Sequence, residues 1–296
     1  MRAQSRALSN PVALWWAMLT LVSLANIVFW FILYRELAGG SGSATSLSSQ
    51  SGQMLALSAA YVFGCAFRSV LPRADVQRIC LVDSWLSSIF VGRSVATIAE
   101  IAFAAQWAII LAQLGAIADA DTAVNMARLI VPIIVVAEIC SWYAVVTKNF
   151  LYNAIENSLW AVAFLLVGIG LGRLLPEFDG LVRGLLIAGL VGIACYLAFL
   201  VVVDVPMYVK RWRIERAAGV PLLHPLVGLR DSATQWTVTH EFEHWKEEIA
   251  WMSLYFSAAV WGSLALCALS AMNDHLPQAR AQASAPAAIV QPVQTR

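Results

Sequence analysis

Apolar residues occur along this chain in long blocks separated by short polar segments, without the alternation that half-buried strands show. Seven blocks are long enough to cross a hydrocarbon core of about 30 Å as helices that rise about 1.5 Å per residue. They lie near 12–34, 54–72, 86–114, 128–147, 154–175, 182–208 and 249–272. The pattern predicts an all-α fold, a polytopic bundle of seven transmembrane helices.

The segments outside these blocks are too short for a separate soluble domain. We expect a cytoplasmic N-terminal tail at 1–11, the transmembrane bundle at 12–272, and a disordered extracytoplasmic tail at 273–296. The longest connection is 209–248. Its first part, KRWRIERAAG, is predicted to extend the sixth helix, and its last part is predicted to lead directly into the seventh helix.

Lysine and arginine are distributed unevenly between the two sides of the predicted bundle. Twelve lie on the side of the N-terminus and six on the side of the C-terminus. Because basic loops stay in the cytoplasm, the N-terminus is predicted inside and the C-terminus outside, in a bacterial inner membrane. We expect the basic segments to meet anionic lipid headgroups, and tryptophans near the span ends to lie at the interface. These tryptophans are Trp15, Trp16, Trp85, Trp212, Trp236, Trp245 and Trp251.

Composition narrows the functional classes further. Only 12% of the residues are charged, against about a quarter in soluble domains. The five cysteines form no C-x-x-C pair, so we expect them to fill gaps between helices. Since the chain shows no phosphate-binding loop and no nucleic-acid surface, the expected partners are membrane lipids and a small ligand. The sequence does not indicate an oligomeric state.

Ionisable and amide side chains inside the predicted spans are the candidate ligand-binding residues. A charge at the bilayer centre costs at least about 2.5–3.5 kcal/mol, so it needs a partner or a wet cavity. The candidates are Arg93, Glu100, Glu138, Asn153, Glu156, Asn157 and Asp204. Arg93 and Glu100 are seven residues apart and share a helical face, and Arg93 is predicted to pair with Glu100 or Glu156.

Two interpretations of these residues remain open. They could form a structural ion pair with protonated carboxyl groups that are hydrogen-bonded between helices. They could also line a polar cavity, open toward the cytoplasm, that binds or transports a small ligand, an ion or a lipid. The triplet Ala-Glu-Ile recurs around Glu100 and Glu138 in neighbouring antiparallel spans, a pattern typical of inverted repeats in transporters.

Residues 240–244 read HEFEH and match H-E-x-x-H, the spacing that puts two zinc-binding histidines on one helical face. Zinc is therefore the one cofactor that the sequence suggests, with His240 and His244 as ligands and Glu241 as the catalytic base of a hydrolase. Charged neighbours such as Glu243 and Lys246 instead favour a solvated amphipathic run, without metal, that leads into the seventh span.

Seven spans, a cytoplasmic N-terminus and H-x-x-x-H at the cytoplasmic end of the seventh span resemble the membrane hydrolase superfamily of adiponectin receptors and alkaline ceramidases. The resemblance implies a zinc-dependent lipid hydrolase with a further histidine in the second span. Here 54–72 contains no histidine, so Glu156 or Asp204 would have to replace that ligand.

Two other seven-helix classes are excluded by single residues. The span at 249–272 has no lysine for a retinal Schiff base, and no span core has a histidine for haem. The sequence leaves three classes open: a ligand-binding or transport protein, a metal-dependent lipid hydrolase, and a structural or assembly protein of the membrane.

Overall fold

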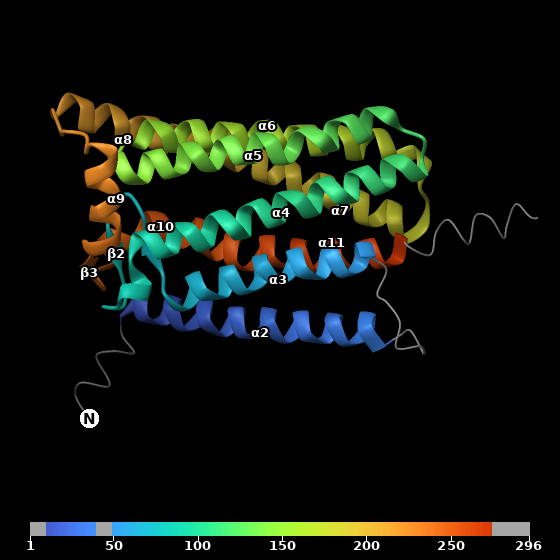
Figure 1. Cartoon of the computed structure of the whole chain (residues 1–296), viewed down its shortest axis with the longest axis horizontal. Coiled ribbons are helices and arrows are strands. Elements are labelled where there is room, and N and C mark those ends of the chain that lie inside the picture. The colour runs from blue at the N-terminus through green and yellow to red at the C-terminus, as the bar shows by residue number, and fades with distance from the viewer. Residues whose placement is uncertain (1–9, 40–48, 274–296) are drawn as a thin grey trace, which may run out of the picture.

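The computed structural model of the chain describes residues 10–39 and 49–273, and within these ranges seven helices are long and apolar enough to cross a membrane (Figure 1). The first five spans are α2 (Pro11–Gly39), α3 (Ser49–Val70), α4 (Ile89–Ile117), α5 (Asp121–Thr147) and α6 (Phe150–Leu174). The predicted seven-helix bundle is confirmed. The predicted tails lie almost entirely outside the described residues.

The last two spans are each built from three consecutive helical segments. The sixth consists of α7 (Gly180–Phe199), the π-helical turn η3 (Leu200–Asp204) and α8 (Val205–Ala217). The seventh consists of α10 (Phe242–Leu254), the π-helical turn η4 (Tyr255–Ala259) and α11 (Val260–Asn273). The predicted extension of the sixth helix by KRWRIERAAG is therefore confirmed, because α8 continues α7 without a break.

One end of the bundle carries a small sheet and a short helix, and we call it the sheet end; the opposite end is the far end (Figure 1). The sheet pairs β1 (Arg73–Ala74) antiparallel with β2 (Ile79–Cys80), and β2 parallel with β3 (Thr237–Val238). The remaining elements are α9 (Pro225–Thr234) and the 3₁₀ turns η1 (Trp85–Ser87) and η2 (Leu175–Glu177). The sheet joins two connections that are distant in the sequence.

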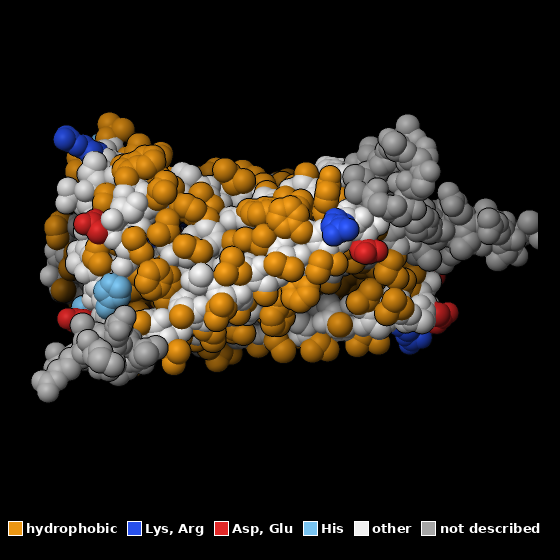
Figure 2. Space-filling model, turned by 90° about the horizontal axis from the view of Figure 1, so that it is seen from below, with side chains coloured by type: hydrophobic (Ala, Val, Ile, Leu, Met, Phe, Trp, Pro, Cys, Tyr) orange, Lys and Arg blue, Asp and Glu red, His pale blue; other side chains and the backbone are white. Residues whose placement is uncertain are grey.

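Large apolar side chains cover the outside of the bundle between its two ends. Leu21, Ile98, Ile139 and Val202 are each more than half exposed, although they lie in the middle of long helices. Figure 2 shows this apolar band on one face, with charged side chains near the ends. Such a surface is stable where lipid, rather than water, surrounds the helices. The chain is an integral membrane protein of the multi-pass helical class.

All three arginines of the 68–83 segment at the sheet end, Arg68, Arg73 and Arg78, are buried, contrary to the prediction that this basic segment meets lipid headgroups. Arg73 is 1% exposed and donates hydrogen bonds of 2.8–3.1 Å to the carbonyl oxygens of Leu71, Leu86 and Ser88. Burial lowers the pKa of the Arg73 guanidinium to about 10, so it stays protonated at neutral pH. Backbone carbonyls at the ends of helices need donors, and Arg73 supplies them for this connection.

Arg78 fixes the same connection to α9 and to the end of α5. Its Nε donates to Asp231 Oδ2 at 2.9 Å, and its Nη2 donates to the Val145 carbonyl oxygen at 2.8 Å. Arg78 is 4% exposed, so it too is removed from the lipid surface. The basic residues of this connection thus hold the sheet end together.

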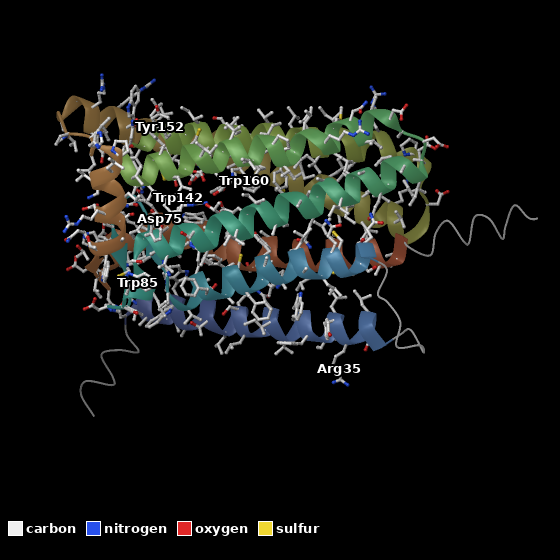
Figure 3. The ribbon with its side chains drawn as sticks, in the orientation of Figure 1. Arg35, Asp75, Trp85, Trp142, Tyr152 and Trp160 are labelled. Carbon is white, nitrogen blue, oxygen red and sulfur yellow. The ribbon has the colours of Figure 1, made fainter. Side chains whose placement is uncertain are left out.

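Two of the tryptophans that were assigned to the membrane interface lie in the core instead. The rings of Trp15 on α2 and Trp245 on α10 have centroids 5.7 Å apart, and both side chains are buried. Trp15 Nε1 donates to Ser253 Oγ at 3.0 Å, and Trp245 Nε1 donates to the Thr239 carbonyl oxygen at 2.9 Å. Trp85, by contrast, is exposed at the sheet end (Figure 3).

Candidate functional site

A buried arginine joins three helices in the half of the bundle nearer the sheet end. Arg93 on α4 donates from Nη2 to Glu100 Oε2 on the same helix and to Glu138 Oε2 on α5, the latter at 2.7 Å. Its Nη1 lies 3.9 Å from Glu156 Oε1 on α6. All four side chains are at least nine-tenths buried. We call these residues the Arg93 cluster; the predicted partners Glu100 and Glu156 are both present, and Glu138 completes the set.

Three further side chains hold the carboxyl groups of the cluster in place. Thr97 Oγ1 donates to Glu138 Oε2 at 2.6 Å and accepts a hydrogen bond from Trp142 Nε1 at 3.0 Å. Tyr255 in η4 donates from its hydroxyl group to Glu100 Oε1 at 3.0 Å. Sequence reasoning missed all three. The sequence could have indicated Thr97, because this residue lies between Arg93 and Glu100 on one helical face.

The predicted polar stripe at the start of α6 is also present. Asn153 Nδ2 donates to Glu156 Oε2 at 3.1 Å, and Asn157 Nδ2 donates to the Asn153 carbonyl oxygen at 3.1 Å. Trp160 follows one turn later and lies between α4 and α6 (Figure 3). The stripe faces the interior because Asn153, Glu156 and Trp160 are all buried.

Three carboxyl groups share a single guanidinium in this cluster. Oxygen atoms of Glu100, Glu138 and Glu156 lie within 4.8 Å of one another, and no other such group of His, Cys, Asp or Glu is found among the described residues. Arg93 Nη2 already donates to two of them, so a guanidinium is the cation of this site. The surplus of carboxyl groups leaves acceptors for a proton or for a ligand's hydrogen-bond donors.

A cavity of about 660 Å³ runs along one side of the Arg93 cluster. Toward the sheet end it is lined by polar side chains such as Asp75, Asp204 and Glu248, and toward the far end by apolar ones such as Leu171 and Leu266. Arg93, Glu100 and Glu156 stand between these two parts. The cavity is therefore amphipathic along its length.

Six buried polar atoms of cavity-lining residues have no hydrogen-bond partner among the described residues: Tyr61 Oη, Asp75 Oδ1, Arg93 Nε, Trp107 Nε1, Ser141 Oγ and Asn153 Oδ1. Two of them lie beside Glu156, the donor Arg93 Nε and the acceptor Asn153 Oδ1. Buried polar groups are normally satisfied, and an unsatisfied one costs about 1–3 kcal/mol. A ligand that offers both an acceptor and a donor would satisfy both atoms.

Asp204 occupies a different part of the same cavity. It lies in η3, is 8% exposed and lines the cavity, but no ion pair joins it to Arg93 in the described part of the chain. Glu248 on α10 lines the same polar part, where it accepts hydrogen bonds from Gln77 at 2.9 Å and Trp251 at 2.6 Å. Six of the seven candidate residues thus line the same cavity, with Asp204 apart from the others, whereas Glu138 contacts Arg93 but does not line the cavity.

The HEFEH segment has a geometry that the sequence did not predict. The helix α10 begins at Phe242, so His240 and Glu241 precede it, and the expectation that both histidines share a helical face is wrong. His244 Nδ1 lies 3.2 Å from Thr239 Oγ1 and 3.5 Å from a Glu241 carboxylate oxygen. The run is amphipathic, as expected: Trp245 and Glu248 are buried, whereas 241–244, 246 and 247 are exposed.

Fold and site together define a multi-pass helical membrane protein with a buried ion-pair cluster on the wall of an amphipathic cavity. Comparison with protein families, with curated proteins and with solved structures finds no match for this chain. The cavity and its polar residues are therefore the features of the molecule that bear on its function.

Proposed function

We propose that this protein binds a small amphipathic ligand in its intramembrane cavity, or carries it through the membrane. The polar part of the ligand lies beside the Arg93 cluster, and its apolar part lies toward the far end. The membrane that we propose is the bacterial inner membrane, which helical rather than barrel-shaped proteins span.

The observation that carries this proposal is the set of six unpartnered polar atoms on residues of the cavity wall, of which Arg93 Nε and Asn153 Oδ1 lie beside Glu156. Ligand sites are typically cavities of about 300–1,000 Å³ with mostly apolar walls and a few polar groups that orient the ligand. The cavity has this size and this division of its walls. An ion pair with only a structural role would not require a cavity beside it.

Binding is tested with 1-O-octylglycerol and the purified protein in nanodiscs, with the shift in unfolding temperature as the readout. Asn153→Ala removes one hydrogen-bond partner of the ligand, so its affinity for the probe should fall about tenfold. Asn125→Ala, at an exposed position of α5, is the matched control and should bind like the parent protein. Equal affinity of the parent protein, Asn153→Ala and Asn125→Ala for the probe would contradict the proposal. The Arg93 cluster would then have a structural role.

The orientation in the membrane is tested with reporter fusions. A reporter fused after residue 296 should be active only outside the cytoplasm, and one fused at Gly219, just after α8, only inside. The excess of basic residues on the side of the N-terminus motivates this orientation, which would make the sheet end cytoplasmic. Swapped activities would invert the orientation and turn the polar part of the cavity outward.

The lipid hydrolase alternative is tested by metal analysis of the purified protein. We expect no stoichiometric zinc, because His240 lies outside α10 and the exposed His244 faces Thr239 and Glu241. One zinc per chain in the parent protein, lost when both histidines are changed to alanine, would favour the hydrolase over the binding protein. Glu241→Gln would then be expected to keep the metal and lose hydrolysis.

A further inference from the structure

The wall of the cavity is incomplete between α7 and the seventh span. The helix α7 packs against α6, whereas α11 packs against α2, α3 and α4, and no comparable packing joins α7 to α11 in the described ranges. The cavity is nevertheless lined from both sides, by Ile193 on α7 and Leu266 on α11 among others. Both helices belong to membrane spans, so this gap faces the hydrocarbon core of the bilayer.

The edges of the gap are residues that line the cavity and are also exposed on the outer surface. They are Ala188, Gly192 and Cys195 on α7, and Leu254, Ala258, Trp261 and Ala265 on α10, η4 and α11. We call this gap the portal. On each side these residues recur at intervals of three and four, so they follow one helical face. Most of them are small, which leaves space between the two helices.

The described residues contain two π-helical turns, η3 and η4, one in each span beside the portal. Asp204 and Leu200 of η3, and Tyr255 and Ala258 of η4, all line the cavity. Single π-helical turns inside α-helices are frequent at functional sites. Here η4 directs the Tyr255 hydroxyl group to Glu100 in the Arg93 cluster.

An ion pair joins the two sides of the portal at the sheet end. Arg211 on α8 pairs with Glu247 on α10, and its Nη1 lies 3.7 Å from Glu248 Oε1. The sixth and seventh spans are thus held together beside the sheet, while their membrane-embedded parts stay apart. The gap between them therefore offers a route from the bilayer into the cavity.

The side chains that line the cavity indicate which chemical class of ligand it would bind. Arg93 Nε offers a donor and Asn153 Oδ1 an acceptor, and hydroxyl groups suit both because each can donate and accept. The cavity wall carries five carboxyl groups, of Asp75, Glu100, Glu156, Asp204 and Glu248, against three arginines, Arg68, Arg73 and Arg93, so a phosphate headgroup would meet an excess of like charges. Leu171, Leu186 and Leu266 line the apolar part, which suits an alkyl chain.

We propose that the ligand is a neutral lipid with a hydroxylated headgroup, and that it enters sideways from the bilayer through the portal. This inference rests on the proposed function and adds the class of ligand and its route. The headgroup binds at Arg93 and Asn153, and the chain extends toward the far end.

The route is tested by photolabelling in nanodiscs with a monoacylglycerol that carries a diazirine in its acyl chain. Gly192→Phe places a ring in the portal, where a Cβ atom at this position meets nothing within 4 Å. The initial rate of labelling of cavity-lining peptides from α4 and α6 should fall about tenfold, within the range by which mutations change association rates. Gly184→Phe is the matched control, since Gly184 is exposed on the same helix but does not line the cavity.

A reversible block at the native Cys195 gives a second measurement that does not depend on how Gly192→Phe folds. Benzyl methanethiosulfonate attached to Cys195 should slow labelling, and reduction of the mixed disulfide should restore it. Cys195→Ser should be insensitive to the reagent. The headgroup is tested with a lysophosphatidic acid that carries the same diazirine chain, which should label the cavity more weakly than the monoacylglycerol.

The outcomes bear separately on the portal, on the headgroup and on ligand binding. Equal labelling rates in Gly192→Phe and Gly184→Phe, together with no effect of the reagent at Cys195, would overturn the portal but leave ligand binding intact. Stronger labelling by the anionic probe would overturn the hydroxylated headgroup. Absence of cavity labelling by either probe in the parent protein would overturn the proposed function as well.

Discussion

Arg93→Ala is expected to lower the free energy of unfolding by about 3–5 kcal/mol, because it leaves buried carboxyl groups without their counter-ion. Arg93 Nη2 donates to both Glu100 and Glu138, and Glu156 lies 3.9 Å from Nη1. The measurement is thermal or denaturant unfolding of the purified protein in detergent. The loss should exceed that of any exposed arginine, such as Arg35, which points away from the bundle at the far end (Figure 3).

Removal of the carboxyl charges should restore much of this stability. Combining Arg93→Met with Glu100→Gln and Glu138→Gln replaces Arg93 and the two carboxyl groups to which it donates with neutral side chains of similar size, and keeps Glu156. Arg35→Ala is the matched control and should change stability little, since surface substitutions are usually within about 0.5 kcal/mol. Unfolding of Arg93→Ala at the same temperature as the parent protein would mean that the cluster does not hold the three helices together.

Gly228→Ala is expected to destabilise the sheet end by about 3 kcal/mol, since overpacking of a rigid contact costs this much or more. A Cβ atom on Gly228 would lie 1.6 Å from the carbonyl oxygen of Val146, so α9 would have to move away from the end of α5. The hydrogen bond from Leu223 N to the Thr147 carbonyl oxygen, 3.2 Å long, belongs to the same junction.

The matched control for Gly228→Ala is Gly184→Ala. A Cβ atom on Gly184 meets nothing within 4 Å, and alanine is favoured over glycine inside a helix by up to about 1 kcal/mol. Unfolding temperatures and proteolysis of the 218–241 connection would report the difference between the two variants. Equal stability of Gly228→Ala and the parent protein would show that α9 is not seated on α5.

The membrane architecture was predictable because lipid imposes long apolar runs on every span, and such runs are visible in the sequence. All four residues of the Arg93 cluster were among the candidates, because charged residues stand out in apolar runs, and two of the polar faces were predictable for a similarly local reason. Arg93 and Glu100 share a face of α4, and Asn153 and Glu156 share a face of α6. The recurrence of Ala-Glu-Ile also has a structural counterpart, since both of its glutamates, Glu100 and Glu138, bind Arg93.

The contacts that were missed join residues far apart in the chain. Tyr255 reaches Glu100 across 155 residues, and no local pattern relates the two positions. Arg73 and Trp245 looked like interfacial residues because each lies beside a span, and there the local sequence does not distinguish a buried side chain from one at the membrane interface. Arg73 and Trp245 are buried because they donate hydrogen bonds to backbone carbonyl oxygens of the connections at the sheet end, and these oxygens come into place only on folding.

The central claim is that the cavity holds an amphipathic ligand with its polar group at the Arg93 cluster. The most direct measurement is the location of 1-O-(8-bromooctyl)glycerol in crystals of the protein by anomalous scattering from bromine. We predict bromine in the apolar part of the cavity, near Leu171 and Leu266, with the glycerol group at Asn153 and Arg93. Bromine found only on the outer, lipid-facing surface of the bundle, with an empty cavity, would contradict the claim.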